Sequence, residues 1–151
     1  MSLDRRTLLG HGARLGVAAF LGVAGRAVAD AGALERALAG LADGAFPLED
    51  ERLALVAPAV AENGDGVPIS FTVESPMTAE DHVETVVVVA PANPEPEIAR
   101  FRFTPASGVA SAAVRIRLAE TQDLVAVART SAGALYRTSR RVEVIVAGCA
   151  G

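Results

Sequence analysis

The single cysteine of this chain, Cys149, stands two residues before the last position, in the sequence VEVIVAGCAG. The thiolate is the reactive form of cysteine, and an unperturbed thiol loses its proton only near about pH 8.5. A thiol that attacks a substrate therefore needs a base or a cation beside it. The upstream cations Arg140 and Arg141 are about 25–30 Å away along an extended strand. We therefore expect a thiol that the active sites of other proteins activate and modify.

The rest of the sequence lacks the partners that catalytic cysteines use. Beyond residue 29 it contains one histidine, His82, and no second cysteine, so neither a catalytic triad nor a dithiol cycle can form. A blue-copper site needs two histidines beside the cysteine, so Met77 and His82 do not complete one. No Cys-x-x-Cys-His motif for haem attachment is present. We expect no enzyme activity, no metal and no cofactor, and a surface position for His82 beside Asp81 and Glu84.

Small residues surround Cys149 on both sides and leave nothing local to build a pocket around its sulfur. They are Ala147, Gly148, Ala150 and Gly151. At 3.3–3.6 Å for each extended residue, Cys149 can stand about 10 Å beyond Val146. Glycine also lacks a preferred backbone conformation. The sequence therefore predicts a thin, flexible arm over residues 147–151, with Cys149 as the attachment site for a substrate.

The N-terminal segment has the features of an export signal. Arg5 and Arg6 precede a modest apolar run, and Ala27-Val28-Ala29 matches the small-x-small pattern that signal peptidases cut after. The paired arginines indicate the twin-arginine route and a periplasmic location. We therefore predict a signal peptide over 1–29, a carrier domain over 30–146 and the arm over 147–151. In an oxidising compartment, one leftover cysteine implies intermolecular pairing or a free thiol with a function.

The charge of the remaining chain excludes several classes of partner. It has no lysine, and ten arginines stand against seventeen acidic residues. An acidic surface without basic clusters argues against binding of nucleic acid or anionic lipid. No later stretch of the sequence is long and apolar enough to span a bilayer. We therefore expect neither nucleic acid nor membrane as a partner.

A short helix is predicted ahead of the strands, over residues 33–44. Leu34, Leu38 and Leu41 fall on one face of such a helix, and Gly44 is the predicted stop. We expect this apolar face to cover the core.

Most of the chain reads as β-strands with turn residues between them. In 67–74 the apolar residues alternate with polar ones, as in a half-buried strand, whereas 84–90 is apolar on both faces, as in a more central strand. Ser131-Ala132-Gly133 marks a hairpin turn. The predicted fold is an all-β, immunoglobulin-like antiparallel sandwich of about seven strands. The strands are expected within 53–56, 67–74, 84–90, 99–103, 112–120, 124–130 and 135–146.

Four segments together resemble the SoxY family, the sulfur-carrier subunits of the bacterial thiosulfate-oxidising Sox multienzyme system. They are APAVAENGDGVPISFTVESPMTAEDHV (57–83), ANPEPEIARFRFTPASG (92–108), RTSAGALYRTSRRVEVIV (129–146) and the tail with Cys149. The family tail is usually Gly-Gly-Cys-Gly-Gly, and here Ala147 and Ala150 replace two of the glycines. Each replacement removes backbone freedom worth about 0.5–1 kcal/mol but leaves the thiol chemistry intact.

The resemblance implies a function and a set of partners. Sulfur intermediates would stay covalently bound to Cys149 while separate enzymes act on them. Those enzymes would be a haem-containing enzyme that couples thiosulfate to the thiol, a hydrolase that releases sulfate and a dehydrogenase that oxidises the remaining sulfane sulfur. A SoxZ-like β-sandwich subunit would form a heterodimer with the chain.

Two further interpretations stay open from the sequence. A structural or assembly protein of β-sandwich type would carry Cys149 as an incidental free thiol. The second concerns four arginines that point outward from two strands expected to be neighbours, which form either a solvated face or a surface toward the second subunit. They are Arg100, Arg102, Arg115 and Arg117.

Overall fold

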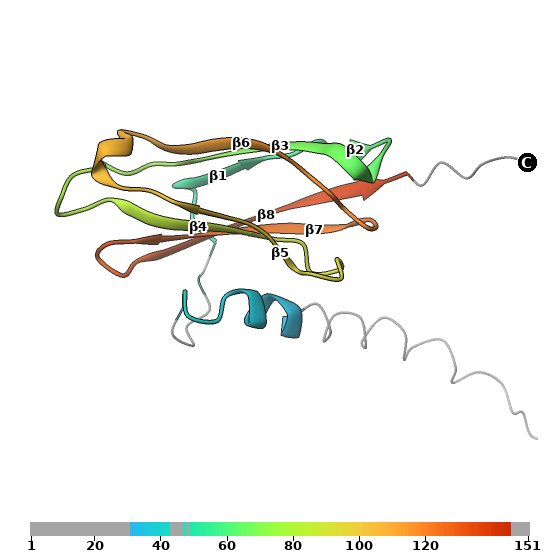
Figure 1. Ribbon diagram of the computed structural model, residues 1–151, viewed down its shortest axis with the longest axis horizontal. Coiled ribbons are helices and arrows are strands. Elements are labelled where there is room, and N and C mark those ends of the chain that lie inside the picture. Colours follow the sequence, from blue (N-terminus) through green and yellow to red (C-terminus); the bar gives the residue numbers. More distant parts are fainter. Residues whose placement is uncertain (1–30, 43–46, 48, 146–151) are drawn as a thin grey trace, which may run out of the picture.

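Two β-sheets face one another, and a short helix lies on the outside of one of them (Figure 1). The computed structural model describes residues 31–42, 47 and 49–145. The predicted signal peptide, Val146 and the predicted arm with Cys149 lie outside these residues. One sheet has the strand order β1-β3-β6, and the other has the order β2-β8-β7-β4-β5. The strands are β1 (Leu53–Val56), β2 (Val60–Ala61), β3 (Val67–Val73), β4 (Val83–Val89), β5 (Glu97–Arg102), β6 (Ala110–Ile116), β7 (Gln122–Thr130) and β8 (Leu135–Val144).

The predicted all-β sandwich is confirmed, with one strand that was not predicted. This strand, β2, has only two residues, too few to show a hydrophobic period. It pairs with β8 in the parallel direction, so that Val60 lies opposite Glu143. A second parallel bridge joins Glu49 to Arg137. The described part of the chain therefore has eight strands, and the outer side of β8 departs from the antiparallel pattern of the larger sheet.

Strand β3 has the predicted period of two and joins the two sheets through an aromatic cluster. Its inward residues are buried, and Phe71 at their centre is 2 % exposed. The ring of Phe71 packs edge-on against Phe101 and Phe103, with ring centroids 5.0 and 6.1 Å apart. Because β3 and β5 belong to different sheets, these contacts cross the core of the sandwich.

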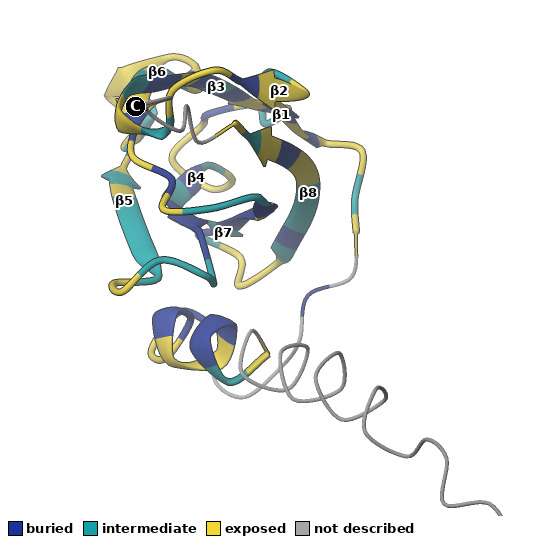
Figure 2. Cartoon of the chain, turned by 90° about the vertical axis from the view of Figure 1, so that its right-hand side faces the viewer, coloured by how far each residue is buried: buried dark blue, intermediate teal, exposed yellow. Residues whose placement is uncertain are grey.

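Strand β4 is buried on both faces, as its continuous apolar sequence predicts. Val86 and Val88 point into the core between the sheets, whereas Val87 and Val89 point outward beneath the helix. The helix packs there through its predicted apolar face, and its buried side is turned toward the sheet (Figure 2). The residues of this outer cluster are Leu34, Ala37, Leu38, Leu41 and Ala42 against Val87, Val89, Val125 and Val127. The expectation that the helix covers the core is confirmed.

The helix ends earlier than predicted. It spans residues 31–37, and turns follow over 38–42. Gly40 has a φ of +79°, in the left-handed region that glycine adopts without a steric penalty. The prediction of Gly44 as the stop was therefore wrong, because the chain leaves the helix before Gly40. Within the described residues, no helix is long and apolar enough to cross a membrane.

The loops gather at two ends of the sandwich. Ile145 and the loops 62–66, 90–96 and 117–121 lie at the end where β8 finishes, which we call the arm end. The loops 74–82, 103–109 and 131–134 lie at the opposite, far end. The predicted hairpin turn at the far end is confirmed, because Gly133 has a φ of +83° and its N–H donates to the Thr130 carbonyl.

The four outward arginines do not lie on neighbouring strands, so that expectation was wrong. Strands β5 and β6 are the last strands of different sheets and do not pair with each other. The chain crosses from one sheet to the other between them, through residues 103–109. A sequence pattern of alternation cannot show this crossing, because both strands alternate in the same way.

Candidate functional site at the arm end

The strand that leads to Cys149 is held on both sides up to its last described residue. Val142 is fully buried between the sheets. On one side, the backbone N–H of Ile145 donates to the Ala61 carbonyl at 2.9 Å, so β2 continues the support of β8. On the other side, the Val144 N–H donates to the Thr121 hydroxyl at 2.9 Å. The predicted anchoring of the last strand is confirmed for Val142 and Val144.

Covalent geometry limits how far Cys149 can lie from this anchor. Cys149 is four positions after Ile145, so an extended chain spans about 13–14 Å between the two. The sequence beyond Ile145 has valine as its largest side chain. A narrow peptide of this reach can enter a channel that would exclude an ordinary loop.

A hollow of about 450 Å³ lies at the base of the arm. Its walls come from the 62–66 and 117–121 loops and from the end of β8, and the residues are Glu62, Asn63, Gly64, Asp65, Arg117, Leu118, Ala119, Val144 and Ile145. Its charged groups are exposed, and Arg117 forms an ion pair with Asp65 at 3.2 Å. The hollow therefore presents both signs of charge rather than a dedicated anion or cation site.

Gly64 lets the two loops of the hollow meet. Its carbonyl accepts a hydrogen bond from the Leu118 N–H at 2.8 Å. A Cβ on Gly64 would overlap the Leu118 carbonyl oxygen and would press on the Val144 side chain. The side chain of Asn63 caps the short turn that follows, by accepting from the Asp65 N–H at 2.8 Å. The AENG segment therefore packs directly against the strand that carries the arm.

A buried amide network fixes the third loop of the arm end. Gln122, only 4 % exposed, accepts from the Ala92 N–H and donates to the Asn93 side-chain oxygen, both at 2.9 Å. That same oxygen accepts from the Ala119 N–H at 2.9 Å, and the Asn93 amide donates to the Arg117 carbonyl at 2.8 Å. The 90–96 and 117–121 loops are thus joined without any charged group.

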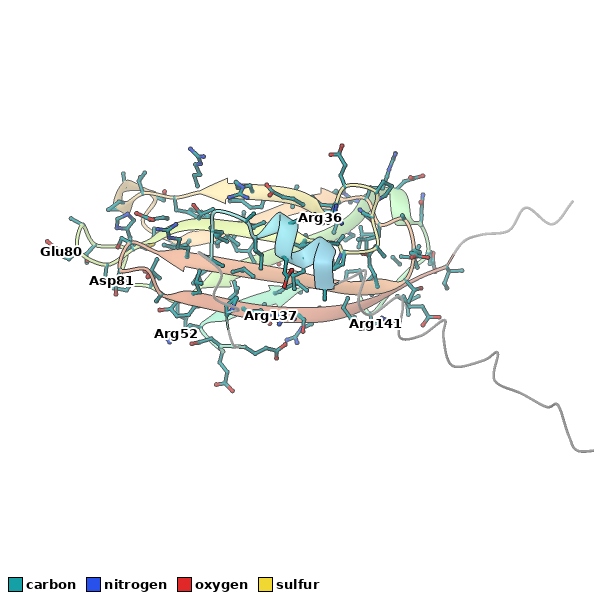
Figure 3. All side chains as sticks on the ribbon, turned by 90° about the horizontal axis from the view of Figure 1, so that it is seen from below. Arg36, Arg52, Glu80, Asp81, Arg137 and Arg141 are labelled. Atoms are coloured by element: carbon teal, nitrogen blue, oxygen red, sulfur yellow. The ribbon has the colours of Figure 1, made fainter. Side chains whose placement is uncertain are left out.

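His82 lies at the far end, as the last residue of the 74–82 loop. Its Nδ1 is 3.0 Å from the Thr78 carbonyl oxygen, and its N–H donates to the Ser131 hydroxyl at 3.1 Å. Figure 3 shows its neighbour Asp81 at one end of the molecule and Arg141 toward the other. The length of β8, about 30 Å at 3.3 Å per residue, separates this end from the arm base. Since Cys149 reaches only about 14 Å from Ile145, His82 cannot act as its base.

No group of three or more histidine, cysteine, aspartate or glutamate side chains that could hold a metal occurs in the part of the chain that the structure describes. Met77, which sequence reasoning compared with a copper ligand, is 7 % exposed within the core cluster. It has a φ of +51° in the turn after β3. Its role in the structure is to fill the core at the far end.

Sequence reasoning identified the segments of the arm end but not their contacts. Asn63-Gly64 and Asn93-Pro94 are recognisable as turns, because these residue types favour turn conformations. Nothing in the sequence signals that Thr121 holds Val144. The burial of Gln122 had one available sign, its place as a polar residue at the start of an apolar strand. Cys149 and the predicted flanks Ala147, Gly148, Ala150 and Gly151 lie outside the described residues.

Solved structures of other proteins superpose on this fold. The sulfur carrier protein SoxY from Chlorobium limicola f thiosulfatophilum superposes with a TM-score of 0.68 and 29 % identity, over 80 % of this chain and 98 % of that one. A putative superoxide reductase from Thermotoga maritima has a TM-score of 0.56 and 20 % identity, over 70 % of this chain and 98 % of that one. A superoxide reductase from Ignicoccus hospitalis has a TM-score of 0.56 and 13 % identity, over 62 and 79 %. The two reductases share the fold alone.

Comparison with curated protein sequences finds no match. The family model described as sulfur oxidation protein SoxY matches residues 38–149, which include the turns after the helix, all eight described strands and Cys149. The family segments around Asn63-Gly64 and Asn93 are the ones that build the base of the arm. On this match, the chain belongs to the SoxY family of sulfur oxidation proteins.

Proposed function

We propose that this protein is a periplasmic sulfur carrier that holds thiosulfate-derived intermediates covalently on Cys149. The observation that carries the proposal is the extent of the family match, which runs to Cys149, the only thiol of the chain. The anchoring of β8 up to Ile145 supports it, because a carrier needs a rigid body behind a reactive tip. The solved SoxY relative is itself described as a sulfur carrier protein.

The chemistry follows from the thiol. Oxidative coupling joins the Cys149 sulfur to the sulfane sulfur of thiosulfate, releases one proton from the thiol and passes two electrons to an acceptor. The product is a cysteine S-thiosulfonate. Hydrolysis of its terminal sulfur–sulfur bond consumes one water and releases sulfate and a proton, which leaves a persulfide on Cys149. Neither step needs a base from this chain, in agreement with the position of His82 at the end of the sandwich opposite Ile145.

The carrier is therefore not an enzyme, and its reactions take place in the active sites of its partners. The resemblance to the family implies three of them: a haem-containing enzyme that accepts the two electrons, a hydrolase that releases sulfate and a sulfane dehydrogenase. A SoxZ-like β-sandwich subunit is the proposed permanent partner. Export by the twin-arginine route would deliver the folded chain to the periplasm, where the single thiol needs no internal disulfide partner.

Intact-mass spectrometry tests the proposal. The protein is purified under non-reducing conditions from sulfur-oxidising cells grown with and without thiosulfate. We expect discrete added masses of the S-thiosulfonate and the persulfide on Cys149 only during growth on thiosulfate. Cys149→Ser is the matched control, since it differs by one atom and should carry no adduct. An unmodified Cys149 throughout growth on thiosulfate would refute the carrier role and favour a structural protein with an incidental thiol.

A further inference from the structure

One side of the sandwich is open. Strands β5 and β6 are the last strands of their sheets and lie on the same side of the molecule (Figure 2). The opposite side is closed, because the Arg140 guanidinium donates to the Leu55 carbonyl at 3.2 Å between the sheets. In the described residues no strand pairs with the outer edge of β5 or β6. We call this the β5–β6 side.

Core side chains reach the surface along the β5–β6 side. Five apolar residues of the two strands and their connection pack against the core and yet remain only partly buried. They are Ile98, Phe101, Phe103, Ala112 and Val114. Their counterparts in the central strands β3 and β4 are almost completely buried. A partly exposed strip that contains two phenylalanines is unusual for a free surface and typical of a contact with another protein.

The backbone of β5 shows what shape of partner fits this side. The Phe103 N–H donates to the Glu84 carbonyl of the neighbouring β4 chain at 2.9 Å. In an antiparallel ladder, successive residues direct their N–H and C=O groups to opposite sides. The backbone groups of Arg100 and Arg102 therefore point away from β4, toward the open edge. Such a row of donors and acceptors matches an extended strand.

The charges beside this edge show what side chains the partner strand should carry. Arg100 is already neutralised, because its guanidinium donates to both carboxylate oxygens of Glu97, at 2.8 and 2.7 Å. Arg102 is exposed and forms no ion pair in the described structure. A strand that adds to β5 places alternate side chains beside Arg102 on the outer face of the sheet. A carboxylate at that position would pair with its guanidinium.

We propose that the β5–β6 side is the docking surface for the second subunit of the carrier, which adds an edge strand with an outward carboxylate to β5 and covers Phe101 and Phe103. This inference rests on the proposed function for the identity of the partner. The surface leaves the arm end uncovered, so a docked subunit would not block the approach of enzymes to Cys149.

Two measurements on the recombinant SoxZ-like subunit test the docking surface. The first is hydrogen exchange of the wild-type protein, alone and with the partner. We expect the amides of Arg100 and Arg102 to become protected at least about tenfold on binding, as in a paired strand. Protection of these amides without the partner, at high protein concentration, would assign the side to a second copy of this chain and overturn the proposal.

The second measurement compares two substitutions at one position by calorimetric titration with the same partner. Arg102→Ala keeps the backbone donor and should weaken binding about two- to fivefold, the range of an exposed ion pair. Arg102→Pro also removes the donor and should weaken binding at least about tenfold more, whereas the β4–β5 ladder does not use this N–H. Arg141→Ala, on β8, is the control for loss of an arginine elsewhere. Equal binding by all variants would place the partner on another surface.

The proposed docking surface and the proposed carrier function can be refuted independently of each other. The Cys149→Ser variant should bind the partner with the same dependence on Arg102, since Cys149 is not one of the residues that form the proposed surface. If that dependence holds while wild-type Cys149 never gains sulfur, the carrier proposal is wrong and the docking surface stands. If Cys149 gains sulfur while the Arg102 variants bind normally, the docking surface is wrong and the carrier proposal stands.

Discussion

Gly64 and Leu118, from two loops more than fifty residues apart in sequence, meet so closely that no side chain fits at position 64. The carbonyl of Gly64 accepts from the Leu118 N–H at 2.8 Å, and Val144 of the arm-bearing strand packs against the same point. Gly64 therefore contributes to the packing at the end of β8, the strand that precedes Cys149 in the sequence. This contact gives the AENG segment a physical role that turn propensity alone does not.

Gly64→Ala should lower the free energy of unfolding by about 1–3 kcal/mol, because the obstacle is the backbone of Leu118, which cannot rotate away as a side chain can. Thermal or denaturant unfolding measures the effect. Gly32→Ala is the matched control, since nothing lies within 4 Å of a Cβ at that helical position. The control should leave stability unchanged or raise it by up to about 1 kcal/mol through helix propensity. Equal stability of Gly64→Ala and wild type would contradict the steric account.

The amide network predicts coupled effects at positions 93 and 122. Gln122→Leu leaves the Ala92 N–H without its side-chain acceptor and should cost about 1–3 kcal/mol of stability. Asn93→Ala removes the acceptor shared by Gln122 and Ala119 and should cost a similar amount. Because the two side chains bond to each other, the double variant should lose less than the sum of the single losses. Strict additivity in denaturant unfolding would show that the two side chains act independently.

Cys149 should behave as an ordinary thiol in the isolated protein. In the described part of the chain no histidine lies at the arm end, so we expect the rate of alkylation by iodoacetamide to rise with pH around a midpoint of about 8.5. His82→Gln should leave this profile unchanged, because the hydrogen bonds of His82 place it at the far end. A midpoint well below this value, or one that moves in His82→Gln, would point to an activated thiol and to catalysis by the chain itself.

Asp50 provides a test of the geometry near β1. Side-chain hydrogen bonds from Arg52, the closer at 2.6 Å, lower the pKa of Asp50 from its ordinary 3.8 to about 2. A lowered carboxylate pKa adds stability that is fully present above the ordinary value and is lost as the pH falls toward about 2. Carbon-detected NMR titration should find the midpoint of Asp50 near 2 in the wild type and higher in Arg52→Gln.

The Arg52→Gln variant should also melt closer to the wild type at pH 2 than at pH 6, since protonation of Asp50 weakens in the wild type an interaction that the variant already lacks. Arg52 also lies over the Tyr136 ring, with its guanidinium carbon 4.1 Å from the centroid. Arg52→Lys, which keeps a cation at this position, is the control for that contact. An unchanged Asp50 titration in Arg52→Gln would show that another group sets its pKa.

Local patterns determined the class of fold and predicted the chemistry of the tail. The alternation in β3 and the continuous valines of β4 predicted a half-buried strand and a doubly covered one, because burial on one or both faces selects the residue at each position. The residues around Cys149 likewise predicted a carrier thiol rather than an enzyme, since no activating side chain stands close to Cys149 in the sequence. These properties need no knowledge of which strands meet.

The tertiary structure alone decided which segments meet and where the sandwich stays open. Arg100 and Arg115 have the same alternation in sequence, yet their strands end different sheets. Gly40 rather than Gly44 ends the helix turn, and Gln122 is buried although its residue type is usually exposed. The physical reason is that strand order, loop closure and burial of a polar group depend on partners distant in the chain. A local sequence pattern indicates on which face of its strand or helix a residue lies, but not which distant residue packs against it.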